Sequence, residues 1–107
     1  CALDITMDYI GGKWKSVILW YLIEKPLRFG ELKKLIPDIT EKMLSLQLKT
    51  LEKYKIIKRK AYSTVPPKVV YSYTKEGQGL IPVVKALAKW GRQQGEKYGK
   101  VEIKKIK

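Results

Sequence analysis

The residues whose types and spacing suggest chemistry lie along 40–54, where lysines alternate with leucines and small polar side chains. Leu44, Leu48 and Leu51 recur at i, i+4 and i+7, which predicts a helix that buries this stripe and turns its other side outward. On DNA, lysine donates to guanine, glutamine donates to adenine, and apolar side chains contact thymine methyl groups. The side chains that we expect to contact bases are those of Thr40, Lys42, Met43, Ser45, Leu46, Gln47, Lys49 and Thr50. The alternative is the ordinary solvated face of an amphipathic helix.

A second group of cations follows this helix. Beyond Lys55 the sequence alternates with a period of two, and residues 56–63 and 69–73 predict two strands joined by a proline-containing loop. We expect Lys58 and Lys68 on this hairpin to neutralise DNA phosphates, and Arg28 in the short extended segment 27–29 to join them. A hairpin whose lysines only protect its edges from aggregation would look similar.

The composition excludes most kinds of catalytic and metal site. Histidine, the commonest general base and metal ligand, is absent, and a single cysteine cannot build a Cys-rich zinc site. We therefore expect no enzyme, no cofactor and no metal. The 107 residues carry 23 Lys and Arg against 10 Asp and Glu, a net charge of +13, which indicates a polyanionic partner.

The apolar runs are short. The longest, residues 17–23, falls well below the roughly 20 residues that span a bilayer, and no secretory signal pattern is visible. The sequence therefore predicts a cytoplasmic protein with no membrane partner. Because it begins with Cys1 rather than Met, we expect native residues to precede it.

The elements that must position these cations follow from periodicity and turn residues. Helices are expected at 2–10, 13–25, 30–36, 40–54 and 75–98, the last capped by Thr74 and kinked or split at Pro82. With the hairpin, this order predicts a mainly α protein with a small β-hairpin (α+β). The architecture is a winged helix-turn-helix with extra N- and C-terminal dimerisation helices. Residues 1–98 are expected to form the single domain and 99–107 a frayed basic tail.

The two terminal helices carry more apolar surface than a small winged-helix core could bury. We therefore expect a homodimer with two-fold symmetry. Its expected interface includes Leu3, Met7, Ile10, Leu80, Val84, Leu87 and Trp90. The alternative is that the terminal helices fold back on their own domain.

Five spaced motifs carry a resemblance to a known family: IGGKW (10–14), RFGEL (28–32), ITEKML (39–44), VPPKVVY (65–71) and TKEG (74–77). Together they resemble the HxlR-type winged-helix transcription regulators, relatives of the MarR group, over nearly the whole chain. The resemblance implies homodimers that bind operator DNA. It also implies a cysteine just before the first helix that some members use as a redox or electrophile sensor, and Cys1 stands at that place.

These observations predict a sequence-specific transcriptional regulator, a repressor, whose third helix enters the major groove while the wing contacts flanking phosphates or the minor groove. The expected partners are double-stranded operator DNA, a second copy of the chain, and a small-molecule or oxidant effector. The alternative is a basic RNA-binding or ribosome-associated domain, for which Tyr62, Tyr71 and Tyr73 are the only candidate stacking side chains. A membrane-surface binder would need an unburied amphipathic helix, whereas the apolar faces here all serve the core or the dimer.

Overall fold

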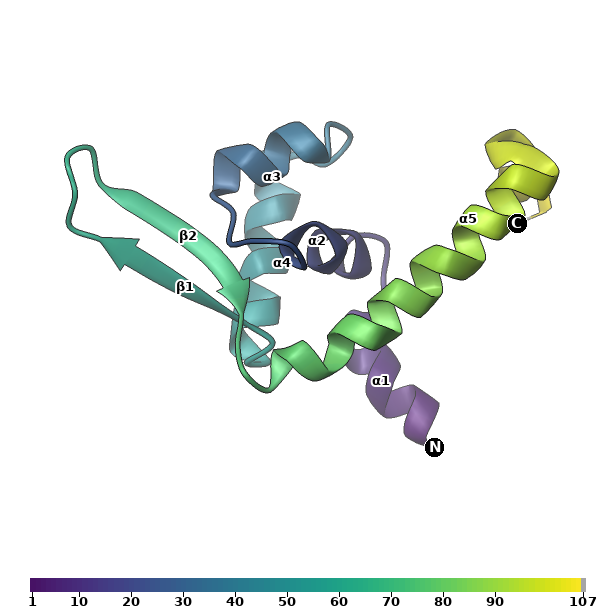
Figure 1. The fold of residues 1–107 in the computed structure, drawn as a ribbon, viewed down its shortest axis with the longest axis horizontal. Helices are drawn as coiled ribbons and strands as arrows, with labels where there is room; N and C mark the ends of the chain where they lie inside the picture. Colours follow the sequence, from purple (N-terminus) through teal and green to yellow (C-terminus); the bar gives the residue numbers. More distant parts are fainter. Residues whose placement is uncertain (107) are drawn as a thin grey trace.

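The computed structural model describes the backbone of residues 1–106 and the side chains of residues 1–98. The elements are, in chain order, α1 (Ala2–Ile10), α2 (Lys15–Leu22), α3 (Phe29–Leu35), α4 (Glu41–Lys53), β1 (Ile57–Tyr62), β2 (Lys68–Tyr73), a 3-10 turn η1 (Gly77–Leu80) and α5 (Ile81–Ile106). Helices α3 and α4 form the helix-turn-helix, and the antiparallel pair β1–β2 forms the wing (Figure 1). The predicted winged helix-turn-helix is therefore confirmed.

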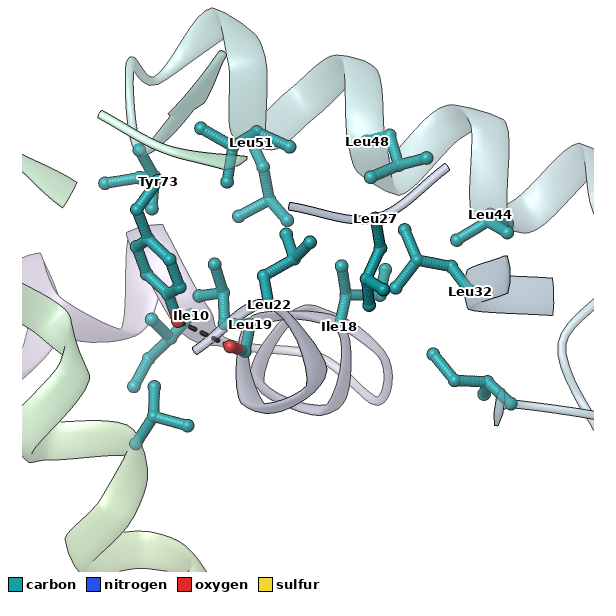
Figure 2. Packing of buried hydrophobic residues seen from close by; sticks show 14 of the residues in the cluster. Ile10, Ile18, Leu19, Leu22, Leu27, Leu32, Leu44, Leu48, Leu51 and Tyr73 are labelled. Atoms are coloured by element: carbon teal, nitrogen blue, oxygen red, sulfur yellow. Dashed lines mark hydrogen bonds between the residues drawn. The ribbon is translucent and has the colours of Figure 1, made fainter. Parts of the chain in front are cut away.

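The hydrophobic core lies mainly between α2 and α4. The buried leucines of α4, which are Leu44, Leu48 and Leu51, face Ile18 and Leu22 of α2 (Figure 2). Leu27 from the linker before α3 and Leu32 from α3 complete this part of the core. Each fully buried side chain of this kind stabilises the fold by about 1.5–3 kcal/mol. The leucine stripe of the sequence is therefore the inner face of α4, and it fixes which side of α4 is turned away from the core.

Helix α4 ends in a motif that starts the wing. Lys55 has a φ of 63°, in the left-handed region, and its N–H bonds to the carbonyl of Glu52 at 2.9 Å. The N–H of Ile56 reaches back to the carbonyl of Leu51 at 3.0 Å, which completes a Schellman-type C-cap. A lysine therefore occupies a position that glycine usually holds, and it turns the chain from α4 into β1.

The residues that follow β2 contact the end of α4, where the wing begins. The hydroxyl of Thr74 donates to the carbonyl of Lys55 at 2.6 Å and accepts the N–H of Gly77 at 2.9 Å. A β-carbon at Gly77 would lie 2.0 Å from the carbonyl oxygen of Ile56, so only glycine fits there. Part of the TKEG motif therefore joins the end of α4, the base of the wing and the turn η1.

Two local predictions need correction. The helix expected from residue 75 begins only at Gly77, as the 3-10 turn η1, and the expected division falls between η1 and α5. Pro82 lies in the first turn of α5, where its missing N–H costs no helical hydrogen bond. The extended segment expected at 27–29 is shorter, because Leu27 forms a single bridge with Tyr71 and α3 begins at Phe29. The backbone of α5 continues to Ile106, and Lys107 lies outside the described residues. Whether 99–107 acts as a separate tail stays a prediction.

Candidate DNA-binding surface

Thr40 begins the candidate recognition helix. Its side-chain oxygen accepts the backbone N–H of Met43 at 3.0 Å, which is the ordinary N-cap arrangement. Arg28 caps the preceding helix α3, and its backbone N–H is bound by the Glu31 carboxylate at 2.9 Å. Both residues therefore help to start a helix. The side chain of Thr40 is occupied by this cap, whereas Arg28 uses its backbone N–H, so that its guanidinium can still reach a phosphate.

The outward face of α4 carries fewer groups suited to base contact than the sequence predicts. Gln47 is half-buried; its amide nitrogen lies 3.2 Å from the sulfur of Met43, and its side-chain oxygen is buried without a hydrogen-bond partner among the described residues. The hydroxyl of Thr50 donates to the carbonyl of Leu46 at 2.9 Å. Gln47 and Thr50 are thus engaged within their own helix.

Of the α4 residues predicted to contact bases, Lys42, Leu46 and Lys49 are exposed to solvent, and Ser45 beside them is half-buried. Leu46 is 54% exposed although it is a large apolar residue on a helix whose other leucines are buried. An exposed leucine between two lysines gives this face both phosphate- or base-directed donors and an apolar contact for a thymine methyl group.

The two wing lysines that the sequence assigns to phosphates, Lys58 and Lys68, lie far apart along the hairpin. Lys58 is paired with Ser72 near the base of the wing, whereas Lys68 is paired with Tyr62 next to the loop. Arg28 and Lys68 line the same open depression, so the structure brings these two cations together. Lys58 instead lies in a separate depression with Arg59 at the base of the wing.

Among residues 1–98, the cations of this surface form no ion pair with a carboxylate. Within residues 1–98, the one ion pair within 4 Å joins the amino group of Cys1 to Asp4, far from the wing. The excess positive charge is therefore left to attract a partner. In the same part of the chain no cluster of His, Cys, Asp and Glu could hold a metal ion, and no described helix is long and apolar enough to cross a membrane.

The terminal helices expose much of the apolar surface that the sequence assigns to a dimer. Leu3, Met7, Leu87 and Trp90 are between 51% and 72% exposed. Leu80 is half-buried and packs against the core of its own chain. In Figure 1, α1 and α5 extend to one side of the molecule, whereas the wing projects to the other.

Two assignments to the partner-facing surface are wrong. Ile10 and Val84 are 5% and 2% exposed and belong to the core of their own protomer. Periodicity identifies the apolar stripe of each helix, but α1 turns only its last residue inward, and α5 packs on α2 through the side that bears Val84. Cys1, the candidate sensor, is exposed at the N-cap of α1.

Several proteins resemble this chain in sequence and structure. The family model for HxlR-like helix-turn-helix proteins matches residues 9–98. The uncharacterised HTH-type transcriptional regulator YdeP of Bacillus subtilis is 45% identical over 102 residues, which cover 95% of this chain and 80% of YdeP. The solved structure of the redox regulator HypR in its oxidised form has a TM-score of 0.84 and 43% identity, and the match covers 87% of this chain and 96% of that one. For quinone-bound YodB from B. subtilis the TM-score is 0.70 at 30% identity, with 86% and 97% of the two chains covered.

Proposed function

Since the chain belongs to the family of HxlR-like helix-turn-helix transcriptional regulators, we propose that it is a homodimeric repressor that binds operator DNA in the cytoplasm. The observation that carries this proposal is the outward face of α4, where exposed Lys42, Leu46 and Lys49 stand on a helix whose opposite face is fully buried. A rigid helix with such a face is what a major-groove reader requires.

In this mode α4 enters the major groove by its N-terminal half. Lys42, Ser45, Leu46 and Lys49 contact base edges, while Arg28 and the wing lysines bind phosphates on either side. The base contacts supply the preference for one sequence, and the phosphate contacts supply most of the sequence-independent affinity.

The dimer forms through α1 and α5, because these helices carry exposed apolar side chains and extend to the side of the molecule opposite the wing (Figure 1). Two-fold symmetry then presents two α4 helices to half-sites about 34–36 Å apart, or a multiple of that distance. The effector is an oxidant or electrophile. Support comes from HypR, which is described as a redox regulator, from YodB, which was solved with a bound quinone, and from the exposure of Cys1.

The experiment is a set of binding titrations on the DNA upstream of the protein's own gene, on random duplex of the same length, and on structured RNA. About 8–12 phosphate contacts per dimer predict that log K falls with log salt at a slope of about −7 to −11. At one salt concentration the operator should bind roughly 10³-fold tighter than random duplex. Equal binding to operator and random duplex would contradict sequence-specific regulation, and tighter binding to RNA would support the RNA-binding alternative.

A further inference from the structure

A single antiparallel β-bridge joins the linker before α3 to strand β2 of the wing. Leu27 and Tyr71 exchange two backbone hydrogen bonds, Leu27 N–H to the Tyr71 carbonyl at 3.0 Å and Tyr71 N–H to the Leu27 carbonyl at 2.8 Å. Arg28, the N-cap of α3, directly follows the bridged Leu27, and it lines one depression together with Val70 of β2. The bridge therefore holds Arg28 next to the wing.

The register of β1 and β2 decides which wing residues share a face. Val70 is paired with Lys60, and Tyr62 is paired with Lys68. Because alternate residues of a strand point to the same face, Lys60 and Tyr62 lie on one face with Lys68 and Val70. This face therefore brings Lys60 of β1 and Lys68 of β2 together around one tyrosine ring.

An open depression of about 610 Å³ lies over this face, and its lining includes Lys25, Arg28, Tyr62, Lys68 and Val70. Glu31, the one carboxylate of the lining, is already bound to the backbone N–H of Arg28. The depression therefore offers three cationic side chains above an apolar and aromatic surface.

Tyr62 holds two lysines. The Nζ atom of Lys60 lies 5.0 Å from the centroid of its ring, and that of Lys68 lies 5.7 Å away, both within the range of a cation–π interaction. A lysine side chain loses considerable rotamer freedom when it is fixed on a ligand. Lysines already held against a ring lose less of that freedom on binding, and they bind more tightly as a result.

We propose that this depression binds a phosphodiester of the DNA backbone flanking the α4 contact. Tyr62 is then a positioning residue that holds Lys68 toward the depression and Lys60 beside it on the same face of the wing. The inference rests on the proposed DNA binding and adds Lys25, Lys60 and Tyr62 to the surface. The occupant is a polyanion strand, because the depression is open and its cations are spread over the linker before α3 and β2 of the wing.

The test compares Tyr62→Leu with Tyr62→Phe, which keeps the ring and removes only the hydroxyl. Affinity for operator and for random duplex is measured over a series of salt concentrations. Tyr62→Leu should weaken both duplexes alike by roughly three- to tenfold, as expected for lost cation–π contacts in two protomers. Its salt slope should become shallower, and Tyr62→Phe should bind like the wild type.

Lys25→Ala is a second, independent variant on an exposed residue outside the sheet. In a dimer it removes two phosphate contacts, so the slope of log K against log salt should fall by about 1.8. Thermal unfolding of each variant checks the fold, and if Tyr62→Leu does not fold, Lys25→Ala decides the question.

The inference would be overturned by an unchanged salt slope in Lys25→Ala, or by equal losses in Tyr62→Leu and Tyr62→Phe. A loss confined to operator DNA would also overturn it, since that pattern belongs to base contacts. These results differ from a failure of the proposed function itself, in which the wild-type protein shows no preference for any operator.

Discussion

The phenolic hydroxyl of Tyr73 donates a hydrogen bond to the backbone carbonyl of Leu19 at 2.5 Å, and the bond lies in the core (Figure 2). Leu19 is among the last four residues of α2, whose carbonyls have no partner within the helix. Tyr73 ends β2, so this contact fastens the base of the wing to the centre of the core. Burial raises the pKa of the Tyr73 phenol well above its ordinary value of 10.0.

Replacing Tyr73 with Phe removes this bond and leaves the carbonyl of Leu19 buried without a partner. The free energy of unfolding should fall by about 1–3 kcal/mol, the usual cost of an unsatisfied buried group. Urea unfolding followed by circular dichroism measures the change. Tyr62→Phe is the matched control, since its ring is partly exposed, and it should change stability by less than about 0.5 kcal/mol. Equal stabilities for the two variants would show that the Tyr73 bond contributes nothing.

The free energies of unfolding of the wild type and Tyr73→Phe should also differ in their dependence on pH. Because the folded-state pKa of Tyr73 is raised, its contribution to stability is fully present below pH 10 and is lost as the pH rises above 10. The unfolded chain releases this proton in that range while the native protein keeps it. The stability difference between wild type and Tyr73→Phe should therefore shrink from pH 9 to pH 11. A constant difference would contradict the raised pKa.

Gly77→Ala should be strongly destabilising for a steric reason. Its added β-carbon would lie 2.0 Å from the backbone oxygen of Ile56, which is fixed by the N–H of Thr74 at 3.0 Å. We expect a loss of about 1–3 kcal/mol, as for other overpacked sites. Gly79→Ala is the matched control, because nothing lies within 4 Å of its added β-carbon. Thermal unfolding of both variants measures the difference, and similar midpoints would contradict the close approach at Gly77.

Local patterns were enough to predict the elements and the inner face of α4, since Leu44, Leu48 and Leu51 share a helical stripe. They could not predict the bond from Tyr73 to Leu19 or the bridge from Leu27 to Tyr71, because these join residues 54 and 44 positions apart. Periodicity marks a residue as apolar and on a stripe, but the packing of helices decides whether it is buried. That is why Ile10 and Val84 were assigned to the wrong surface.

The α4 and wing residues are expected to have separable effects on DNA binding. Leu46→Ala should change the preference between operator variants, because this exposed side chain is assigned to base contact. Lys58→Ala should weaken all duplexes alike and make the salt slope shallower, because it is assigned to phosphates. Competition binding with single-base operator variants measures the first effect. If Leu46→Ala left both affinity and preference unchanged, Leu46 would not lie in the groove.

The dimer prediction is tested by sedimentation equilibrium. The mass should be about 25 kDa at micromolar concentration, twice the 12.4 kDa of the chain. Trp90 is 65% exposed on α5, and Trp90→Ala should weaken association by about 2 kcal/mol or more if the ring fills the interface. Val65→Ala, at a fully exposed position in the wing loop, is the control and should leave the mass unchanged. A wild-type monomer at this concentration would contradict the prediction.

The last prediction concerns Cys1, which is exposed and stands at the start of α1. An exposed, free thiol is accessible to oxidants and electrophiles. Diamide or a quinone should therefore lower operator affinity in the wild type and leave Cys1→Ser unaffected. Cys1 is the one cysteine of these 107 residues, so a disulfide formed between these residues alone joins two chains. Non-reducing gels would separate that product from a mixed disulfide with a small thiol. An equal response of the two proteins would remove Cys1 from the response and place the effector site elsewhere on the dimer.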